Sequence, residues 1–564
     1  MVGLARADRV SSAWQPQTNS TSAYRGDIDG LRACAILTVL IFHAFPARMS
    51  GGFVGVDVFF VISGYLITTI ILRGLDADAF SFTQFYANRL KRIFPALLVV
   101  LACALVAGYY LLLVSEFSQL GKHVAAGIGF TQNLVLWSEA GYFDAASESK
   151  PLLHLWSLGV EEQFYLLFPL LLWLVMRGRQ RRARAALFLG LTAAGFTLNV
   201  AHVHSDPTAA YFLPQYRFWE LTAGALVATV GTTTAARPVR ELAAAVAVAM
   251  ILGAAFVFDS TTLFPGWAAA LPVGGAALSI LAGPDTWTNR RLLAHPWAIA
   301  VGLISYPLYL WHWPMLTFLR LIEADEPSRG ARAAAVVASF VLAWLTYTLI
   351  ERPIRNGQRS AFKVASLAVT GVLVACAGLA MFRSNGVPGR FPADVQQLAT
   401  YHFDPAASYR AGTCYLTSQP GRTMSGSDFA EACARPEPGK SSLLLWGDSF
   451  SASIYPGLRT AFTDRSVLQY SVSMCPADSA PVADGCGRLR SAQYLCPRQA
   501  ASASTRRSSA GSQLALVGLA AVVFHDRCVA AGRDPERRGG RPAAALAESA
   551  AGHGRRFGRG PDPA

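Results

Sequence analysis

Long apolar segments recur between about residues 33 and 382 of this 564-residue chain, and they constrain its fold more than any other feature. Only 15% of the residues are charged, and the mean hydropathy is +0.34. Such a chain is too apolar for an ordinary soluble protein. The sequence therefore predicts a polytopic α-helical membrane protein with about 10 to 11 transmembrane helices, since each span needs roughly 20 residues. We expect spans near residues 33–48, 54–74, 93–114, 155–176, 185–203, 218–232, 239–258, 266–282, 298–320, 333–350 and 363–382.

Basic residues predict the orientation of these spans. Residues 1–23 are polar and lack the apolar centre of a signal peptide, so we expect a cytoplasmic N-terminus. Counted from there, alternate loops are rich in arginine and lysine and the others are poor, as the positive-inside rule requires. This topology explains much of the net charge of +14, and nucleic acid is not an expected partner. The basic clusters lie at 89–92, 177–184, 237–240, 290–291 and 351–359.

Arg32 and His43 lie on one predicted helix, eleven positions apart. At about 100° per residue they share a face, separated by roughly 16 Å along the axis. Ionisable groups inside a membrane are costly and usually face a bundle interior or a cavity. A histidine that only joins helices through hydrogen bonds explains the spacing equally well.

Two further arginines, Arg89 and Arg92, lie three residues apart on a second segment at the same predicted surface. Guanidinium groups suit phosphate, although many loop arginines only enforce topology. Their clustering with Arg32 favours an anionic ligand.

Other polar residues occur within apolar segments. Acyl transfer to a hydroxyl needs a base that removes the hydroxyl proton and a second group, such as a carboxylate, that orients the base. Each of these residues can also simply join neighbouring helices through hydrogen bonds. The candidates are Glu161, Glu162, His312, Asp57 and Ser63.

The motifs DGLRACAILTVLIFH, GGFVGVDVFFVISGYLI, FYANRLKRIFPA, HLWSLGVEEQFYLLFP and SYPLYLWHWP occur in this order within residues 24–355. In this combination the chain resembles the membrane acyltransferase-3 family, in the subgroup with a C-terminal SGNH domain. The resemblance implies O-acylation, usually O-acetylation, of a cell-envelope glycan such as lipopolysaccharide, in the bacterial inner membrane.

The resemblance also implies an acyl-coenzyme A donor, with acetyl-coenzyme A as the usual case, and no metal. By likeness, the arginine-to-histidine motif of the family corresponds to Arg32 and His43, its arginine pair to Arg89 and Arg92, and its serine-glycine motif to Ser63 and Gly64. The arginines would hold the phosphates and the pantetheine arm would reach His43. His43 would then be a general base or a transient acyl carrier, and the sequence leaves both open.

An SGNH-type α/β domain is expected outside the membrane, because an apolar run ends in Gly-Asp-Ser before a helix-compatible segment. Ser449, preceded by Asp448, would be its nucleophile. Asparagine is absent after Asn385, and neither His525 nor His553 follows an aspartate by three residues. Without the oxyanion donor and base, we expect this partial domain to be catalytically incompetent.

From about residue 487 the chain is rich in Ala, Arg, Gly and Ser, without clear helix or strand periodicity in its basic runs. A disordered basic extension is one interpretation, and a reading-frame shift near residues 485–496 is our preferred hypothesis. Of the nine cysteines, Cys414 and Cys433 are the favoured disulfide pair.

The sequence thus predicts a series of regions, with membrane lipid and an envelope glycan as partners. Two alternatives to an acyltransferase remain: a proton-coupled transporter or flippase, and a pseudo-enzyme with a non-functional SGNH domain. The expected regions are an N-terminus at 1–23, a membrane domain at 24–355, a further transmembrane helix at 362–383, a linker at 384–410, a partial SGNH domain at 411–486 and a basic tail at 487–564.

Overall fold

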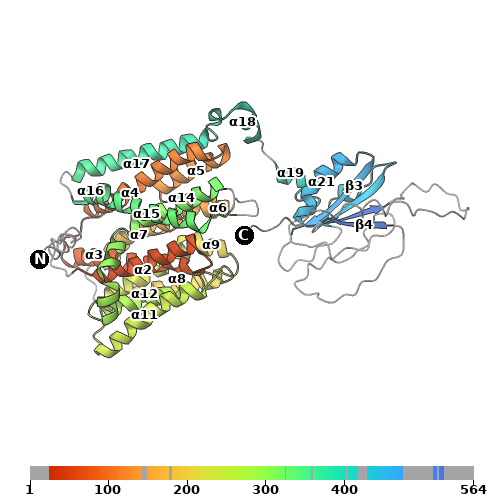
Figure 1. Cartoon of the computed structure of the whole chain (residues 1–564). Helices are drawn as coiled ribbons and strands as arrows, with labels where there is room; N and C mark the ends of the chain where they lie inside the picture. Colours follow the sequence, from red (N-terminus) through yellow and green to blue (C-terminus); the bar gives the residue numbers. More distant parts are fainter. Residues whose placement is uncertain are drawn as a thin grey trace, which may run out of the picture. The chain divides into compact units, whose positions relative to one another are not determined.

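The chain divides into two compact units, residues 1–400 and 401–564, in a computed structural model (Figure 1). The first unit is helical and the second contains a β-sheet. The structure describes residues 24–140, 149–176, 181–323, 326–356, 360–399, 404–416, 428–473, 512–517 and 520–525.

The first unit begins with five helices that supply most of the polar residues predicted for a site. Long helices of this unit run side by side in Figure 1, among them α17 beside α5 and α11 beside α12. The opening elements are α2 (Gly26–Ala44), η1 (Gly52–Val54), α3 (Gly55–Asp76), α4 (Phe82–Leu111), α5 (Val114–Ile128) and α6 (Gln132–Glu139). They continue with α7 (Leu155–Met176), α8 (Arg181–His202), α9 (Pro207–Phe212), η3 (Pro214–Tyr216), α10 (Phe218–Val230), α11 (Arg237–Val257) and α12 (Ala270–Ala282). The last are η4 (Thr288–Leu293), α13 (Pro296–Leu303), α14 (Ser305–Glu323), α15 (Arg329–Leu345), η5 (Thr346–Glu351), α16 (Arg352–Asn356), α17 (Ser360–Arg383), η6 (Pro388–Arg390) and α18 (Ala393–Ala399).

Six helical segments of the described residues are long and apolar enough to cross a membrane. Two shorter apolar helices, α10 and α12, accompany them. The predicted spans at 33–48, 155–176 and 298–320 are not among the six. The six are Gly52–Asp76, Phe82–Leu111, Arg181–His202, Arg237–Val257, Arg329–Arg355 and Ala361–Arg383.

Two predicted spans differ from the observed helices in an informative way. The span expected at 33–48 is a helix from Gly26 to Ala44, and hydropathy misses its first turn because Asp27 and Asp29 there are acidic. The span expected at 298–320 is two helices, with α13 ending at Leu303 and α14 beginning at Ser305. Hydropathy alone cannot detect such a break, since apolar residues flank it on both sides.

Close packing of α3 against α10 depends on two glycines. A Cβ atom at Gly64 would lie 1.9 Å from the carbonyl oxygen of Leu221, and one at Gly224 would lie 2.1 Å from that of Val61. Glycine therefore permits a helix-helix approach that any larger residue would prevent. This approach fixes the neighbouring Ser63 in the site described below.

The second unit has a five-stranded sheet in the order β1-β3-β2-β5-β4, with α21 packed on it (Figure 1). Strand β3 is parallel to β1 and β2, whereas β5 is antiparallel to β2 and β4. The elements are α19 (Pro405–Tyr409), β1 (Tyr415–Leu416), α20 (Glu431–Ala434), β2 (Ser441–Gly447), α21 (Ser449–Ala461), β3 (Arg465–Val472), β4 (Ser512–Val517) and β5 (Ala520–His525).

Strands β4 and β5 fall within the predicted basic tail, which therefore contains secondary structure that its composition did not indicate. Their sequences, SQLALV and AAVVFH, are short apolar runs, as expected of strands. The arginine-rich runs on which the tail was assigned lie outside the described residues.

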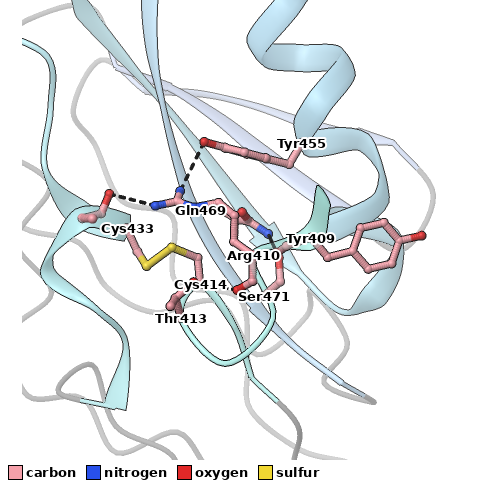
Figure 2. The surroundings of a disulfide bond; sticks show 9 residues. Tyr409, Arg410, Thr413, Cys414, Cys433, Tyr455, Gln469 and Ser471 are labelled. Carbon is pink, nitrogen blue, oxygen red and sulfur yellow. Dashed lines mark hydrogen bonds between the residues drawn. A yellow bond between two sulfur atoms is a disulfide. The ribbon is translucent and has the colours of Figure 1, made fainter. Parts of the chain in front are cut away.

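A disulfide joins Cys414 to Cys433, with a Cα–Cα distance of 5.5 Å, which confirms the predicted pair (Figure 2). Arg410 lies beside it and donates hydrogen bonds to the Tyr455 hydroxyl, at 3.2 Å, and to the Ala432 carbonyl, at 3.3 Å. The bond and this arginine tie α20 to β1 and α21.

Replacing Cys414 and Cys433 with serine is expected to lower the unfolding free energy of the second unit by about 3 kcal/mol, the loop-closure contribution for a ring of this size. Urea-dependent proteolysis of the full-length protein measures the change. Cys103→Ser is the matched control, because Cys103 is a free cysteine of the first unit. An equal effect of the control would contradict the prediction.

Candidate active site

A cavity in the first unit collects most of the predicted site residues. Its empty space is about 870 Å³, part of it open to solvent. Helices α2, α3, α4, α7 and α14 supply its walls. The lining residues are Arg32, Val56, Phe59, Phe60, Ile62, Ser63, Leu66, Ile67, Ile70, Arg89, Arg92, Ile93, Ser157, Leu158, Glu161, Glu162, Tyr165, Ser305, Tyr306 and Tyr309.

The two carboxylates of the cavity are already engaged. Arg89 pairs with Glu162 at 2.6 Å, and its guanidinium lies 3.9 Å from the centre of the Tyr165 ring. Ser63 donates a hydrogen bond to Glu161 at 2.6 Å, and the Tyr165 hydroxyl donates a second to the same oxygen. These contacts join α3, α4 and α7, so Glu161 and Glu162 hold the wall of the cavity together.

The other two arginines differ in their pairing. Arg32 contacts Asp29, one turn earlier on α2, at 3.3 Å. Among the residues that the structure describes, no carboxylate lies within 4.0 Å of Arg92, and the positive charges of Arg32 and Arg89 act on it. A half-buried cation among other cations lacks compensation, which makes this end of the cavity suited to an anion.

His43 does not line the cavity, and its partner is another histidine. Its Nδ1 atom lies 3.0 Å from Nε2 of His312, and the planes of the two rings are 17° apart. The Trp313 ring packs edge-on against His43 at 4.6 Å. The structure therefore brings His43 and His312 together, whereas the described partners of the predicted carboxylates Glu161 and Glu162 do not include His43.

Tyr309 connects the two regions. It lines the cavity, and its ring lies 5.5 Å from that of His312 and 5.4 Å from that of His154. Sequence reasoning missed His154, whose ring is 5.8 Å from that of His312. The signal was available, because this residue opens the motif HLWSLGVEEQFY that also contains Glu161 and Glu162.

Asp57 lies in a separate, fully buried ion cluster and not in the cavity. Arg217 contacts Asp57 at 2.9 Å and Glu220 at 2.9 Å, and all three side chains are at most 1% exposed. The aromatic rings of Phe60 and Trp156 lie 5.5 and 5.6 Å from the guanidinium. One cation thus faces two carboxylates between α3 and α10.

Groups of three or more His, Cys, Asp or Glu side chains arranged to hold a metal ion are absent from the part of the chain that the structure describes. The cavity arginines are the groups suited to a phosphate-bearing ligand.

In the second unit Ser449 is the first residue of α21, and Asp448 alone separates it from strand β2. Asp448 caps this helix, since its carboxylate accepts a hydrogen bond from the Phe450 amide at 2.9 Å. His525 is the one histidine among the described residues of this unit. The ladder pairs it with Ser442, whereas Gly447 pairs with Ala520, so it lies roughly 17 Å along β2 from the end that carries Ser449.

Comparisons with known proteins agree with this architecture. A family model described as "Acyltransferase domain" matches residues 25–348, a range that includes every residue lining the cavity. The first unit is therefore a membrane-bound O-acyltransferase. The chain belongs to the acyltransferase-3 family, and a second model, described as "SGNH domain (fused to AT3 domains)", matches residues 413–546.

Curated relatives match the membrane part of the chain. A putative membrane-bound transacylase, BcsY, of Komagataeibacter xylinus is 31% identical over 63% of this chain and 90% of its own length. The peptidoglycan O-acetyltransferase OatA of Listeria monocytogenes is 29% identical over 61% of this chain. A putative O-acetyltransferase of Staphylococcus aureus, SAS0844, is 30% identical over 59% of this chain. The match spans 58% of the length of each of these last two relatives. No solved structure matches the chain.

Replacing Arg217 with leucine is expected to destabilise the first unit by about 3–5 kcal/mol, because it leaves two buried carboxylates without a cation. Thermal unfolding in detergent measures the loss. Asp57→Asn is the matched control and should cost less, since it leaves a one-to-one pair of Arg217 with Glu220. The reverse order of the two variants would refute the assignment of Arg217 as the shared cation.

Ser449→Ala is expected to leave hydrolysis of a small acyl ester by the full-length protein within about twofold of the unaltered rate, because His525, the one described histidine of this unit, lies at the other end of the β2 ladder from Ser449. A chromogenic acetate ester provides the assay. A loss of tenfold or more would show that Ser449 is an active nucleophile.

Proposed function

We propose that the protein transfers an acyl group, acetyl in the simplest case, from cytoplasmic acyl-coenzyme A to hydroxyl groups of a cell-envelope glycan. The observation that carries this proposal is the gathering of Arg32, Arg89 and Arg92 around one cavity, with Arg92 lacking a carboxylate among the described residues. Coenzyme A bears its phosphates at one end and its thioester at the far end of a long arm.

Helix α2 relates this cavity to the proposed reacting group. Arg32 and His43 are separated by roughly 16 Å along the helix axis, a distance comparable with the pantetheine arm. We place the phosphates on the arginines and the thioester near His43, past Tyr309. Because Tyr309 touches both the cavity and His312, its side chain borders the path that the arm would follow.

The reaction needs a proton acceptor at the hydroxyl. As a base, His43 takes the hydroxyl proton while the oxygen attacks the thioester carbonyl; the carbon–sulfur bond breaks and the leaving thiolate receives the proton. As a carrier, His43 first attacks the thioester carbonyl, the carbon–sulfur bond breaks, and coenzyme A leaves as the thiolate. The hydroxyl oxygen then takes the acyl group from His43, and the hydroxyl proton balances the charge of the thiolate. In both routes Glu161 and Glu162 support the cavity wall through Ser63 and Arg89.

The acceptor and orientation rest on other observations. The relative OatA is named a peptidoglycan O-acetyltransferase, which supports a glycan of the cell envelope, although lipopolysaccharide is equally within the proposal. The basic loops support a cytoplasmic N-terminus in a bacterial inner membrane. The Cys414–Cys433 disulfide supports an oxidising compartment for the second unit.

The test follows purified protein in detergent with radiolabelled acetyl-coenzyme A and records thioester loss and label transfer to envelope glycan. His43→Ala is expected to abolish transfer while the protein remains in the membrane. Activity retained by this variant would overturn the role of His43. Thioester loss without glycan labelling would instead locate the defect at acceptor transfer, as expected if a competent SGNH domain were required.

A phosphate-specific comparison tests the arginines. Arg92→Ala is expected to raise KM for acetyl-coenzyme A by about 10- to 100-fold, the value of a charged hydrogen bond, without changing KM for acetyl-pantetheine, which lacks those phosphates. Arg73→Ala is the matched control, because Arg73 is exposed near the end of α3 and does not line the cavity. An equal effect on both donors would remove Arg92 from phosphate binding.

A further inference from the structure

His312 makes two different kinds of contact through its two ring nitrogens. Its Nδ1 atom lies 2.7 Å from the carbonyl oxygen of Tyr309 and 3.3 Å from that of Leu308, both in the preceding turn of α14. Its Nε2 atom lies 3.0 Å from Nδ1 of His43. The His312 side chain is fully buried, so these contacts fix the orientation of its ring.

The carbonyl contacts determine where the proton of His312 lies. A carbonyl oxygen only accepts hydrogen bonds, so Nδ1 of His312 must carry the proton. Among the described residues no carboxylate lies within 4.0 Å of either ring, and a buried imidazolium without a counterion is costly. His312 is therefore neutral, and its Nε2 atom is a hydrogen-bond acceptor.

The same logic extends to His43. Since Nε2 of His312 accepts, Nδ1 of His43 must donate. A neutral His43 then has its lone pair on Nε2. No described residue forms a hydrogen bond with this atom, and the His43 side chain is only partly buried. The hydrogen bond to His312, whose ring plane is 17° from that of His43, and the edge contact with Trp313 hold the ring in this orientation.

We propose that His312 is a positioning residue that keeps His43 protonated at Nδ1 and presents Nε2 of His43 as the reacting nitrogen. This inference rests on the proposed function and makes it more specific. It applies to both routes above: Nε2 receives the hydroxyl proton as a base, or forms the carbon–nitrogen bond as a carrier. In either case His312 accepts from Nδ1 throughout and supports the positive charge that develops on His43.

Kinetics of two His312 variants test the positioning role. His312→Gln keeps an acceptor, because an amide oxygen can occupy the place of Nε2, and is expected to retain kcat within about tenfold. His312→Leu removes the acceptor and is expected to lower kcat by about 100-fold or more, with KM for acetyl-coenzyme A unchanged in both variants. Binding of a non-reactive thioether analogue of acetyl-coenzyme A verifies that each variant keeps its donor cavity.

A spectroscopic measurement decides the tautomer without any catalytic activity. The protein is labelled with ¹⁵N-histidine in lipid nanodiscs, and the signals of His43 are identified among the ten histidines by subtracting the spectrum of His43→Ala. We expect His43 to have a protonated Nδ1 and an unprotonated Nε2 in the unaltered protein, and a population with protonated Nε2 in His312→Leu.

The outcomes separate this inference from the proposed function. A His43 protonated only at Nε2 in the unaltered protein would overturn the inference whatever the activity, and so would full kcat in His312→Leu. Absence of acyl transfer by the unaltered protein would overturn the proposed function, while the spectrum would still decide the tautomer.

Discussion

The contact between Arg89 and Glu162 is the interaction on which the cavity depends. It joins α4 to α7 in an apolar environment, where an unpaired charge is costly and ionisable groups persist by pairing. Glu161 is likewise held by Ser63 and Tyr165. Both carboxylates are engaged in this way, and Arg92 has no carboxylate within 4.0 Å among the described residues. This end of the cavity is therefore positively charged, as the proposed phosphate-bearing donor requires.

A division of labour follows from this pairing. The carboxylates of the cavity stabilise helix contacts, whereas His43 and His312 do not line the cavity and form a hydrogen bond with each other. Tyr309, which lines the cavity, lies next to His312. A neutral imidazole supplies a base with a fixed orientation and needs no buried counterion. In the proposed reaction, the phosphates of the donor would therefore meet positively charged arginines, whereas the histidine pair is uncharged before the reaction begins.

Local periodicity was enough to predict part of the site. Helix geometry predicted that Arg32 and His43 lie on one helix and that Arg89 and Arg92 lie together. In the structure Arg32 and His43 are both on α2, and Arg32, Arg89 and Arg92 line one cavity. The pairing of His43 with His312 spans 269 positions of sequence and depends on how α14 packs on α2, which spacing cannot reveal. For the same reason Asp57 could be named only as a candidate, and the structure places it with Arg217 in another cluster. Strands β4 and β5 were missed because composition dominated the interpretation of the tail.

The reciprocal glycines of α3 and α10 have a consequence for how this protein can vary. Gly64 lies beside Ser63, which contacts Glu161 in the cavity wall, while α10 begins directly after Arg217 of the ion cluster. A larger side chain at Gly64 or Gly224 would push the two helices apart and disturb both places at once. The cavity and the ion cluster differ in their chemistry, yet a single substitution at this contact between α3 and α10 would disrupt the geometry of both.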